Sequence, residues 1–493
     1  MILELVAGRI IAPYVGVSLY TWTSVIGVIL AGLTLGNFVG GRLADRWPSP
    51  KLLGVVYLVA GLLSLVILSI DGTHRALAIN ELIEGEQHVV IPILFLTGAL
   101  FFLPAAALGA ISPIIVKLTV RDLARTGSTV GRIYGFGSIG SIAGTFATGF
   151  WLISRFGTHR IVLGVAVVLL FLGVLFLIGK RWPWLLVAAA VLGAGMWQAT
   201  ARGWLDGPCS VETNYFCIRV REEEKRGQLV RVLVLDRLVH SYSSLTDPTH
   251  LVYGYERGYA AATAYQADQT GGDPSALFIG GGGYTFPRYT EAVFPESVVT
   301  VIEIDPWVTE VAHQTLGLPR DTQIATHNED ARVFLERTPD RGYDLVFGDA
   351  FNDFSVPYHL TTKEFNDRVH AWLAADGLYI VNVIDGGTGP FLRPYVHTMH
   401  QTFAYVYLAP TSESWRELAH NTFVVIGTDA PLDRDALRRI DAEDGTLDLV
   451  DYVLADDELI AWLAEVTPVT LTDRFAPVDQ LLTAVFRGEA PGD

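Results

Sequence analysis

Four glycines and an acidic residue that follows them are the first feature of this sequence that points to chemistry. The run Gly280–Gly283 comes directly after the short apolar stretch Ala276–Ile279, and Glu303 closes the next apolar stretch, Val298–Ile302. Glycines let a backbone approach a ligand where a side chain would collide, and an acid at the tip of the second strand accepts hydrogen bonds from ribose hydroxyls. The acid stands about 20 residues beyond the glycines, which is the spacing of a nucleotide-binding unit. The sequence therefore predicts a nucleoside site.

Two further acids come after apolar stretches in the same part of the chain. Asp330 comes after Gln323–Thr326, and Asp349 comes after Tyr343–Phe347. In a doubly wound parallel sheet, ligands bind outside the carboxyl ends of the strands, so these acids and the glycines would share one crevice. Taken singly, each acid is better explained as a helix N-cap or a turn residue. For the whole set we favour a functional interpretation.

Composition separates the chain into two unlike parts. Of its 493 residues, 51% are hydrophobic and 18% are charged, whereas an ordinary soluble domain has about 25% charged residues. This composition, with a mean hydropathy of +0.36, excludes a wholly soluble protein. Residues 1–200 hold 13 basic and 7 acidic residues, and the remaining 293 residues hold 22 and 45. The acidic part argues against nucleic-acid binding, and it suits either a cationic substrate or simple solubility.

The first 200 residues have the pattern of a multi-pass membrane domain in a lipid bilayer. A helix needs about 20 mostly apolar residues to cross a bilayer. Ile2–Val15 is shorter, and we interpret it as the end of a helix that begins upstream. Counting Ile2–Val15, we expect six or seven helices. The other apolar stretches are Ser18–Gly41, Leu52–Ile70, Val89–Val116, Gly131–Ile153, Ile161–Ile178 and the shorter Trp184–Thr200.

Charges in the loops indicate an orientation, but they allow two answers. Basic residues mark two loops as cytoplasmic, and the acidic stretch Asp71–Glu86 falls outside. We expect a multi-pass protein of the cell membrane with its acidic part in the cytoplasm. If Trp184–Thr200 crosses the membrane, the alternation of loops between the two sides places the acidic part outside instead. Cys209 and Cys217 follow this point, and we expect ordinary buried thiols, because a strand between them would hold them apart unless it turned. A disulfide would instead fit an oxidising compartment.

After residue 200 the pattern changes to short β-like runs. Tyr215–Val220 and Leu229–Leu235 are such runs, with Asp236 and Arg237 as a turn candidate, and they predict a small antiparallel unit. We therefore expect a multi-pass α-helical membrane domain over 1–200 and a small antiparallel β domain over 201–268. An α/β Rossmann-like domain over 269–493 would then bind the nucleoside and catalyse the reaction.

Residues 211 to about 390 resemble the spermidine synthases, or polyamine aminopropyltransferases, in which a class I methyltransferase-like sheet follows a small β domain. The membrane segment is similar to the membrane-fused branch of that family, which has N-terminal transmembrane helices. The resemblance rests on ETNYFCIRV, ALFIGGGG, VIEIDP, YDLVFGDAFND, LELVAGRIIAPYVG and GGRLADR, which begin at Glu212, Ala276, Val301, Tyr343, Leu3 and Gly40.

The resemblance implies a role for each matching residue. The residues implied to bind the nucleoside are Gly280, Gly281, Gly282, Glu303, Asp330 and Ala331. Among them, Glu303 would hold the ribose, and Asp330 with Ala331 would sit at the adenine edge. Asp349 matches the acid that the family uses as a base toward the attacking amine. The implied co-substrate is decarboxylated S-adenosylmethionine, or S-adenosylmethionine itself.

The amine side of the site departs from the family. Gly283 stands where the family has an amine-binding Asp, and Tyr255 stands where it has a diamine-binding His. A dication would meet fewer carboxylates here, which weakens putrescine as the acceptor. The residues that we expect to replace the lining are Tyr255, Asp353, His240 and Tyr358.

Three functions follow from these features. The leading hypothesis is a transferase that moves an aminopropyl group to an amine acceptor such as a polyamine and releases methylthioadenosine. The second is a methyltransferase on the same fold. The third is a polyamine transporter with a nucleoside-sensing domain, since Gly36–Arg46 is similar to a loop of major facilitator transporters. We expect no metal, because His327 and His359 lack partners at ligand spacing, and a homodimer is implied by the resemblance alone.

Overall fold

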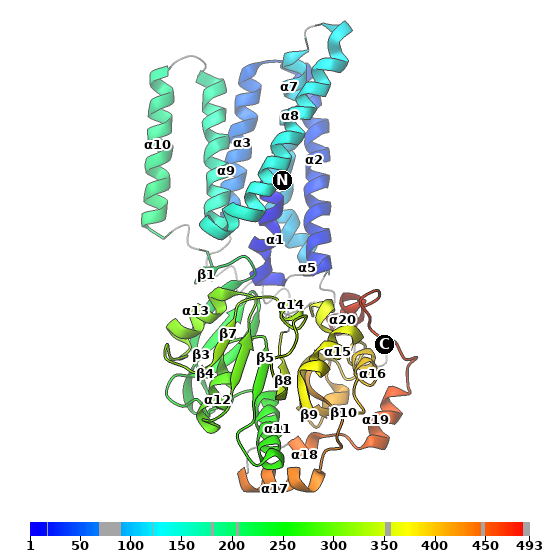
Figure 1. The fold of residues 1–493 in the computed structure, drawn as a ribbon. Helices are drawn as coiled ribbons and strands as arrows, with labels where there is room; N and C mark the ends of the chain where they lie inside the picture. The colour runs from blue at the N-terminus through cyan, green and yellow to red at the C-terminus, as the bar shows by residue number, and fades with distance from the viewer. Residues whose placement is uncertain are drawn as a thin grey trace. The chain divides into compact units, whose positions relative to one another are not determined.

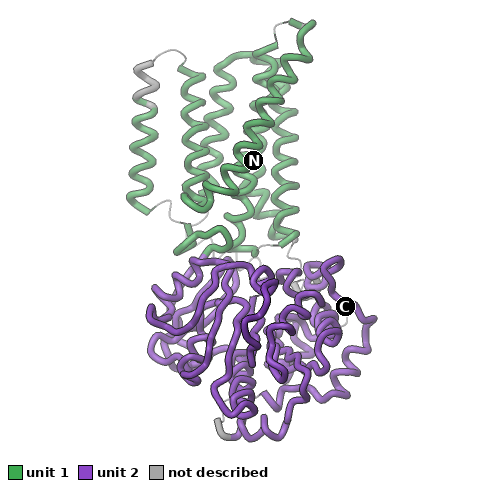
Figure 2. The backbone as a smooth tube through the Cα atoms, viewed as in Figure 1, with its two compact units in different colours: residues 1–217 green, residues 218–493 purple. Residues whose placement is uncertain are grey.

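The computed structural model describes residues 1–16, 18–68, 90–120, 122–178, 182–203, 207–350, 356–444 and 449–486. These residues form two compact units, Met1–Cys217 and Ile218–Asp493, which are green and purple in Figure 2. Each unit has a hydrophobic core of its own. The predicted acidic loop Asp71–Glu86 and the predicted site residue Asp353 lie outside the described residues.

The first unit is helical (Figure 1). Its α-helices are α1 (Ile2–Val15), α2 (Leu19–Arg46), α3 (Pro50–Leu68), α5 (Val90–Thr97), α6 (Leu103–Gly109), α7 (Ile111–Thr119), α8 (Thr126–Ala147), α9 (Ile153–Ile178) and α10 (Trp182–Ala201). Four stretches of the described residues are long and apolar enough to cross a membrane, namely Leu19–Arg46, Pro50–Leu68, Ile91–Thr119 and Thr126–Ile178. The last stretch changes direction at Gly157, where φ is 73°, so it comprises two helical segments.

Helix α2 packs through a row of glycines. A Cβ atom at Gly36 would lie 2.0 Å from the carbonyl oxygen of Ala106, and one at Gly40 would lie 2.5 Å from that of Ala110. In lipid no hydrophobic drive brings helices together, so small residues that let two backbones approach closely supply the packing. These glycines therefore serve contact between helices.

The expectation of two ordinary thiols is wrong, because Cys209 and Cys217 form a disulfide with their Cα atoms 5.1 Å apart. The chain between them turns instead of continuing as a strand. Strand β1 is limited to Val211–Glu212, and the backbone N–H of Thr213 donates to the carbonyl of Phe216 at 2.9 Å. This turn brings together two residues that a straight strand would separate.

The second unit begins with an antiparallel meander. Strands β2 (Cys217–Lys225), β3 (Gln228–Leu235) and β4 (Leu238–Ser244) pair in that order. Asp236 has a φ of 51° between β3 and β4, which confirms the predicted turn.

A seven-stranded mixed sheet forms the centre of the second unit. Its strands lie in the order β10, β11, β9, β8, β5, β6, β7. Strands β5 to β9 pair in parallel with one another, whereas β11 pairs antiparallel with both β9 and β10. The strands are β5 (Ala276–Ile279), β6 (Val299–Ile302), β7 (Ala325–His327), β8 (Tyr343–Gly348), β9 (Leu373–Asp385), β10 (Tyr405–Pro410) and β11 (Asn421–Thr428). Every residue of β5 and β6 is buried, as is typical of parallel strands inside a Rossmann-like sheet.

Helices follow the strands in the order of a doubly wound fold. They are α11 (Gly254–Thr270), α12 (Thr285–Val293), α13 (Pro306–Thr315), α14 (Ala331–Phe334), α15 (Lys363–Trp372), α16 (Leu392–Met399), α17 (Arg434–Asp444), α18 (Leu449–Tyr452), α19 (Asp456–Leu463) and α20 (Val478–Phe486). Local sequence explains where α13 starts, because the Asp305 carboxylate accepts the N–H of Trp307 at 3.0 Å and Pro306 occupies the first turn.

Trp462 packs helix α19 against the hydrophobic core of the second unit. Its side chain is 1% exposed, and its ring centroid lies 5.6 Å from that of Trp415, which in turn contacts Phe423 of β11. The guanidinium of Arg393 covers the indole at 4.5 Å. A little further along the chain, the N–H of Leu471 donates to the Thr398 hydroxyl of α16 at 2.8 Å. Helix α16 therefore holds the segment that follows α19.

Replacing Trp462 with Ala should loosen α19, because a buried aromatic side chain contributes about 3–5 kcal/mol relative to Ala. Amide hydrogen exchange of the full chain in detergent should show faster exchange in α19 and β11. The control Trp462→Phe keeps an aromatic ring at this position and should lose less protection. Unchanged exchange in α19 of the Ala variant would contradict this role.

Candidate active site

The register of the parallel strands brings the predicted site residues to one edge of the sheet. Ile279 lies beside Ile302 of β6 and beside Gly348 of β8, so the residues that follow these three lie at the same carboxyl edge. Backbone bonds continue the pairing there: Gly280 donates to Ile302 and Asp349 donates to Ile279, both at 2.9 Å. The glycine turn, Glu303 and Asp349 therefore converge as the sequence predicted.

Gly280 allows the turn after β5 to contact the end of β8. Its φ is 98°, and a Cβ atom there would lie 2.5 Å from the carbonyl oxygen of Asp349. Gly282 also has a positive φ, 48°, but no atom of the described residues lies within 4 Å of its Cβ position. The backbone at Gly282 is therefore open, which is the property that a nucleoside-binding turn needs.

The absence of an acid at position 283 has a steric reason. A Cβ atom at Gly283 would lie 1.9 Å from Oγ and 2.8 Å from Cβ of Ser241 on β4. Ser243, two residues further along β4, hydrogen-bonds Thr285 at the start of α12 at 2.6 Å. Strand β4 thus packs directly on the glycine turn, and it occupies the space that a side chain at position 283 would need.

Glu303 is held by backbone donors at the tip of β6. Its Oε2 accepts the N–H of Gly281 at 2.8 Å, and its Oε1 accepts the N–H of Asp305 at 2.9 Å. The residue is 6% exposed, and this burial raises the pKa of its carboxyl to about 7, although backbone hydrogen bonds from Asp305, Gly281 and Gly282 oppose the rise. A carboxylate has about four acceptor positions, so one remains that can accept a hydroxyl.

Asp349 is the carboxylate best placed to act as a base. Its Oδ1 accepts a hydrogen bond from the side-chain amide of Asn382 at 2.9 Å, and its Oδ2 accepts one from the Tyr255 hydroxyl at 3.3 Å. Burial raises the pKa of Asp349 to about 6, and both hydrogen bonds act in the opposite direction. A carboxyl with this pKa is mostly ionised near neutral pH and still accepts a proton readily.

Aromatic residues at the start of α11 lie near this carboxylate. Tyr255 is 7% exposed, and its ring lies 5.3 Å from those of Tyr253 and Tyr259. The next residue, Glu256, accepts the N–H of Tyr253 at 3.2 Å and so caps the helix. Burial, with a further contribution from the nearby Asp349 charge, raises the pKa of Glu256 to about 8. Glu256 is therefore largely neutral at pH 7, and Asp349 carries the charge of this pair.

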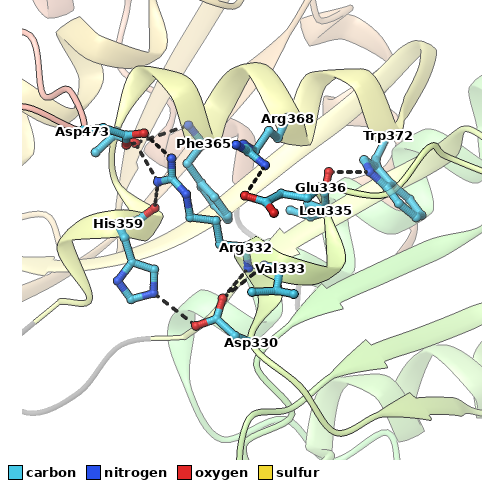
Figure 3. A network of polar contacts seen from close by, with 11 residues as sticks. Asp330, Arg332, Val333, Leu335, Glu336, His359, Phe365, Arg368, Trp372 and Asp473 are labelled. Carbon is cyan, nitrogen blue, oxygen red and sulfur yellow. Dashed lines mark hydrogen bonds and ion pairs between the residues drawn. The ribbon is translucent and has the colours of Figure 1, made fainter.

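Asp330 lies at the end of β7 in a polar network that Figure 3 shows. Its Oδ1 accepts the N–H groups of Arg332 and Val333 at 2.8 and 3.3 Å, so it is the N-cap of α14. Its Oδ2 lies 3.5 Å from Nε2 of His359. The alternative interpretation as a helix cap is therefore correct for Asp330. The buried Ala331 opens the same helix, and the capping leaves one Asp330 oxygen facing His359.

Arg332 joins this network to the C-terminal segment. Its guanidinium forms an ion pair with Asp473 and donates to the carbonyl of His359 at 2.6 Å. Asp473 also accepts the hydroxyl of Thr362 at 2.8 Å. Desolvation is the largest single effect and raises the pKa of Asp473. The ion pair with Arg332 and the hydrogen bonds together outweigh it, so the pKa is lowered. The segment after α19 therefore positions the loop that carries His359.

Of the residues expected to line the amine side, Tyr255 contacts Asp349. His240 on β4 hydrogen-bonds the carbonyl of Leu238 through Nδ1 at 3.0 Å and lies where the register between β3 and β4 shifts. Tyr358 is 57% exposed, with its ring against His359. Among the described residues, no group of three or more His, Cys, Asp and Glu side chains could hold a metal ion.

Two residues of the site were missed from the sequence. Asn382 is the one polar side chain in the apolar run Leu378–Val383 of β9, apart from the hydroxyl of Tyr379, and a polar residue within such a run was the available signal. Its Oδ1 is buried and has no hydrogen-bond partner in the part of the chain that the structure describes. Glu256 gave no comparable signal, because helix caps with Glu in the first turn are common.

Comparisons with known proteins find similarity over part of the chain. The polyamine aminopropyltransferase of Vibrio vulnificus is 34% identical over 108 residues, which are 22% of this chain and 36% of that protein. The eEF1A lysine and N-terminal methyltransferase of Xenopus laevis is 31% identical over 153 residues, which are 29% of this chain and 22% of that protein. These matches therefore span about a third or less of the curated relatives. No family model matches the chain.

A solved structure is also similar. The probable spermidine synthase of Corynebacterium glutamicum has 20% identity and a TM-score of 0.45, and the match covers 52% of this chain and 93% of that one. The curated relatives are transferases of two kinds, as the predicted enzyme class requires. Part of this chain is therefore similar to polyamine aminopropyltransferases and to methyltransferases.

Proposed function

We propose that this protein is a membrane-embedded aminopropyltransferase that uses decarboxylated S-adenosylmethionine and an amine acceptor. The observation that carries the proposal is the position of Asp349. Its backbone lies against Gly280 of the nucleoside turn, and its carboxylate is held by Tyr255 and Asn382. A base is thereby fixed beside the place where a sulfonium nucleoside would bind.

The reaction needs a nucleophilic amine and an in-line approach to the carbon next to sulfur. The amine nitrogen forms a bond to that carbon, the carbon–sulfur bond breaks, and its electron pair leaves on methylthioadenosine. Asp349 accepts the proton that the nitrogen loses, and its negative charge stabilises the cationic transition state. Tyr255 and Asn382 orient the carboxylate so that an oxygen faces the amine.

The described residues fit a nucleoside at the glycine turn. The open Cβ position of Gly282 leaves room for the ligand, and Glu303 retains an acceptor position for a ribose hydroxyl. Asp330 and Ala331 lie at the next strand end, where the adenine would reach. The four apolar stretches of the first unit support the proposal that the enzyme spans the bilayer.

A methyltransferase is the second candidate, and the similarity to the Xenopus laevis methyltransferase favours it. The same base would then assist attack on the methyl carbon of intact S-adenosylmethionine. The nucleoside product distinguishes the two reactions, since methyl transfer releases S-adenosylhomocysteine.

Asp349→Asn should lower turnover by about 100- to 10,000-fold, because that is the usual contribution of a general base. Methylthioadenosine release by the full chain in detergent measures turnover, and isothermal titration with methylthioadenosine measures binding. We expect the affinity to remain, since Asp349 faces the amine. Unchanged turnover would remove the assigned role, and loss of binding as well would indicate a structural role.

The pH profile should show an acidic limb near pH 6, because the base acts in its ionised form and its pKa is about 6. Activity should therefore rise as pH increases through this range. Asn382→Leu removes a hydrogen bond that lowers this pKa, so the limb should move upward by about one pH unit. Tyr255→Phe removes the longer bond and should shift the limb in the same direction by less. A limb that stays in place in both variants would contradict Asp349 as its source.

Glu303→Gln should weaken nucleoside binding by about tenfold or more, because a side-chain amide cannot accept both the Gly281 and Asp305 N–H groups. Titration of the full chain with methylthioadenosine measures the effect. Glu310→Gln is a control with the same charge change, since Glu310 pairs with Arg320 on the exposed side of α13. Equal affinity of both variants would count against Glu303 as the ribose ligand.

A further inference from the structure

One end of the helical unit collects basic residues. Helix α2 ends at Arg46 and α3 begins at Pro50, with Lys51 in its first turn. Lys117, near the end of α7, forms an ion pair at 2.7 Å with Asp45 of α2. The ends of α2 and α7 and the start of α3 therefore meet at the same end of this unit.

Helix α9 runs in the direction opposite to α3. A Cβ atom at Gly54 would lie 2.9 Å from the carbonyl oxygen of Gly173, whereas one at Gly61 would lie 3.1 Å from that of Ala166. Later residues of α3 thus contact earlier residues of α9. The helix from Thr158 to Ile178 spans about 30 Å at 1.5 Å per residue, which is about the thickness of a bilayer core. The start of this segment lies at the end remote from Lys51.

The disulfide-bonded loop is fastened to that remote end. The carboxylate of Glu212 accepts the N–H of Thr158 at 2.9 Å and its hydroxyl at 3.1 Å, directly after the bend at Gly157. Arg9 of α1 donates to the carbonyls of Asn214 and Tyr215 at 3.2 and 2.7 Å, and also to that of Thr213. Helix α1 is at the same end, because Gly8 contacts the ring of Trp22 near the start of α2.

We infer that the Cys209–Cys217 loop, and with it the catalytic unit, lies on the side of the membrane opposite the cytoplasm. This inference rests on one part of the proposed function, namely that the first unit spans the bilayer. Two independent observations point the same way. Basic residues collect on cytoplasmic ends, and a persistent disulfide belongs in an oxidising compartment. The loop is disulfide-bonded, and the contacts of Glu212 and Arg9 hold it at the less basic end.

The two ends of the helical unit differ modestly in their number of basic residues. The disulfide determines which end faces away from the cytoplasm. At the basic end the described residues include Arg42, Arg46, Lys51, Lys117, Arg125 and Arg132. Four basic residues, Arg9, Arg155, Arg160 and Arg202, belong to the opposite end and to the segment after α10.

The chain continues from Cys217 into the catalytic unit without crossing back. All four candidate spans precede Cys209, and none was found among the described residues after it. The catalytic unit is therefore on the same side as the loop. Both the sulfonium nucleoside and the amine acceptor must then reach the cleft from that side.

Cysteine labelling of the full chain in spheroplasts of a bacterial host tests this inference. The background variant is Cys209→Ser with Cys217→Ser, into which one cysteine is placed at either end. Glu224→Cys adds a thiol on the exposed part of β2, and Ser49→Cys adds one between α2 and α3 at the basic end. A membrane-impermeant maleimide is applied before and after lysis, with a cytosolic cysteine protein as a control for leakage.

We expect the impermeant maleimide to shift the band of Glu224→Cys in intact spheroplasts and that of Ser49→Cys only after lysis. The unaltered chain should react in intact spheroplasts only after an impermeant reductant has opened its disulfide. The opposite pattern would overturn the inference, as would labelling of both positions only after lysis. These outcomes do not depend on turnover, so they are independent of which group the enzyme transfers.

Discussion

The candidate site depends on the close approach of the glycine turn after β5 to the end of β8. Gly280 leaves no room for a side chain, since a Cβ atom there would lie 2.5 Å from the carbonyl oxygen of Asp349. This contact sets how far the base lies from the nucleoside turn. The carboxylate is then fixed from two other elements, by Tyr255 of α11 and Asn382 of β9. The glycine turn, α11 and β9 therefore position the Asp349 carboxylate together. Its orientation does not depend on a flexible side chain.

Burial gives the three acids of this edge different protonation states. Desolvation raises the pKa values of Asp349, Glu303 and Glu256 to about 6, 7 and 8. Each carboxyl nevertheless has hydrogen-bond donors, which is what allows acids to persist in a place of low polarity. At neutral pH Asp349 holds most of the charge. The carboxylate of Asp349 therefore carries a negative charge close to the aromatic ring of Tyr255.

The succession of strands and helices along the nucleoside-binding part and the residues at its strand ends could be predicted from the sequence, because spacing and apolar runs determine them. Gly280, Glu303 and Asp349 lie together for that reason. Contacts between distant segments gave no such signal. The hydrogen bond from Asn382 and the contact of Ser241 with Gly283 depend on how β9 and β4 pack, which periodicity does not specify.

The expectation of two ordinary thiols failed for a similar physical reason. The disulfide depends on a tight turn within Thr213–Phe216. The residues around this turn have a strand-like sequence pattern, which gave no indication of the turn. Asp330 does lie at a strand end, but helix capping occupies one of its oxygens.

The most direct test of the central claim is the identity of the nucleoside that the full chain releases in detergent. The chain would be given decarboxylated or intact S-adenosylmethionine with a panel of amines, and the products would be identified by mass spectrometry. The proposed function predicts methylthioadenosine whose release depends on one amine, together with that amine extended by an aminopropyl group. Release of S-adenosylhomocysteine, or nucleoside binding with no release at all, would contradict it.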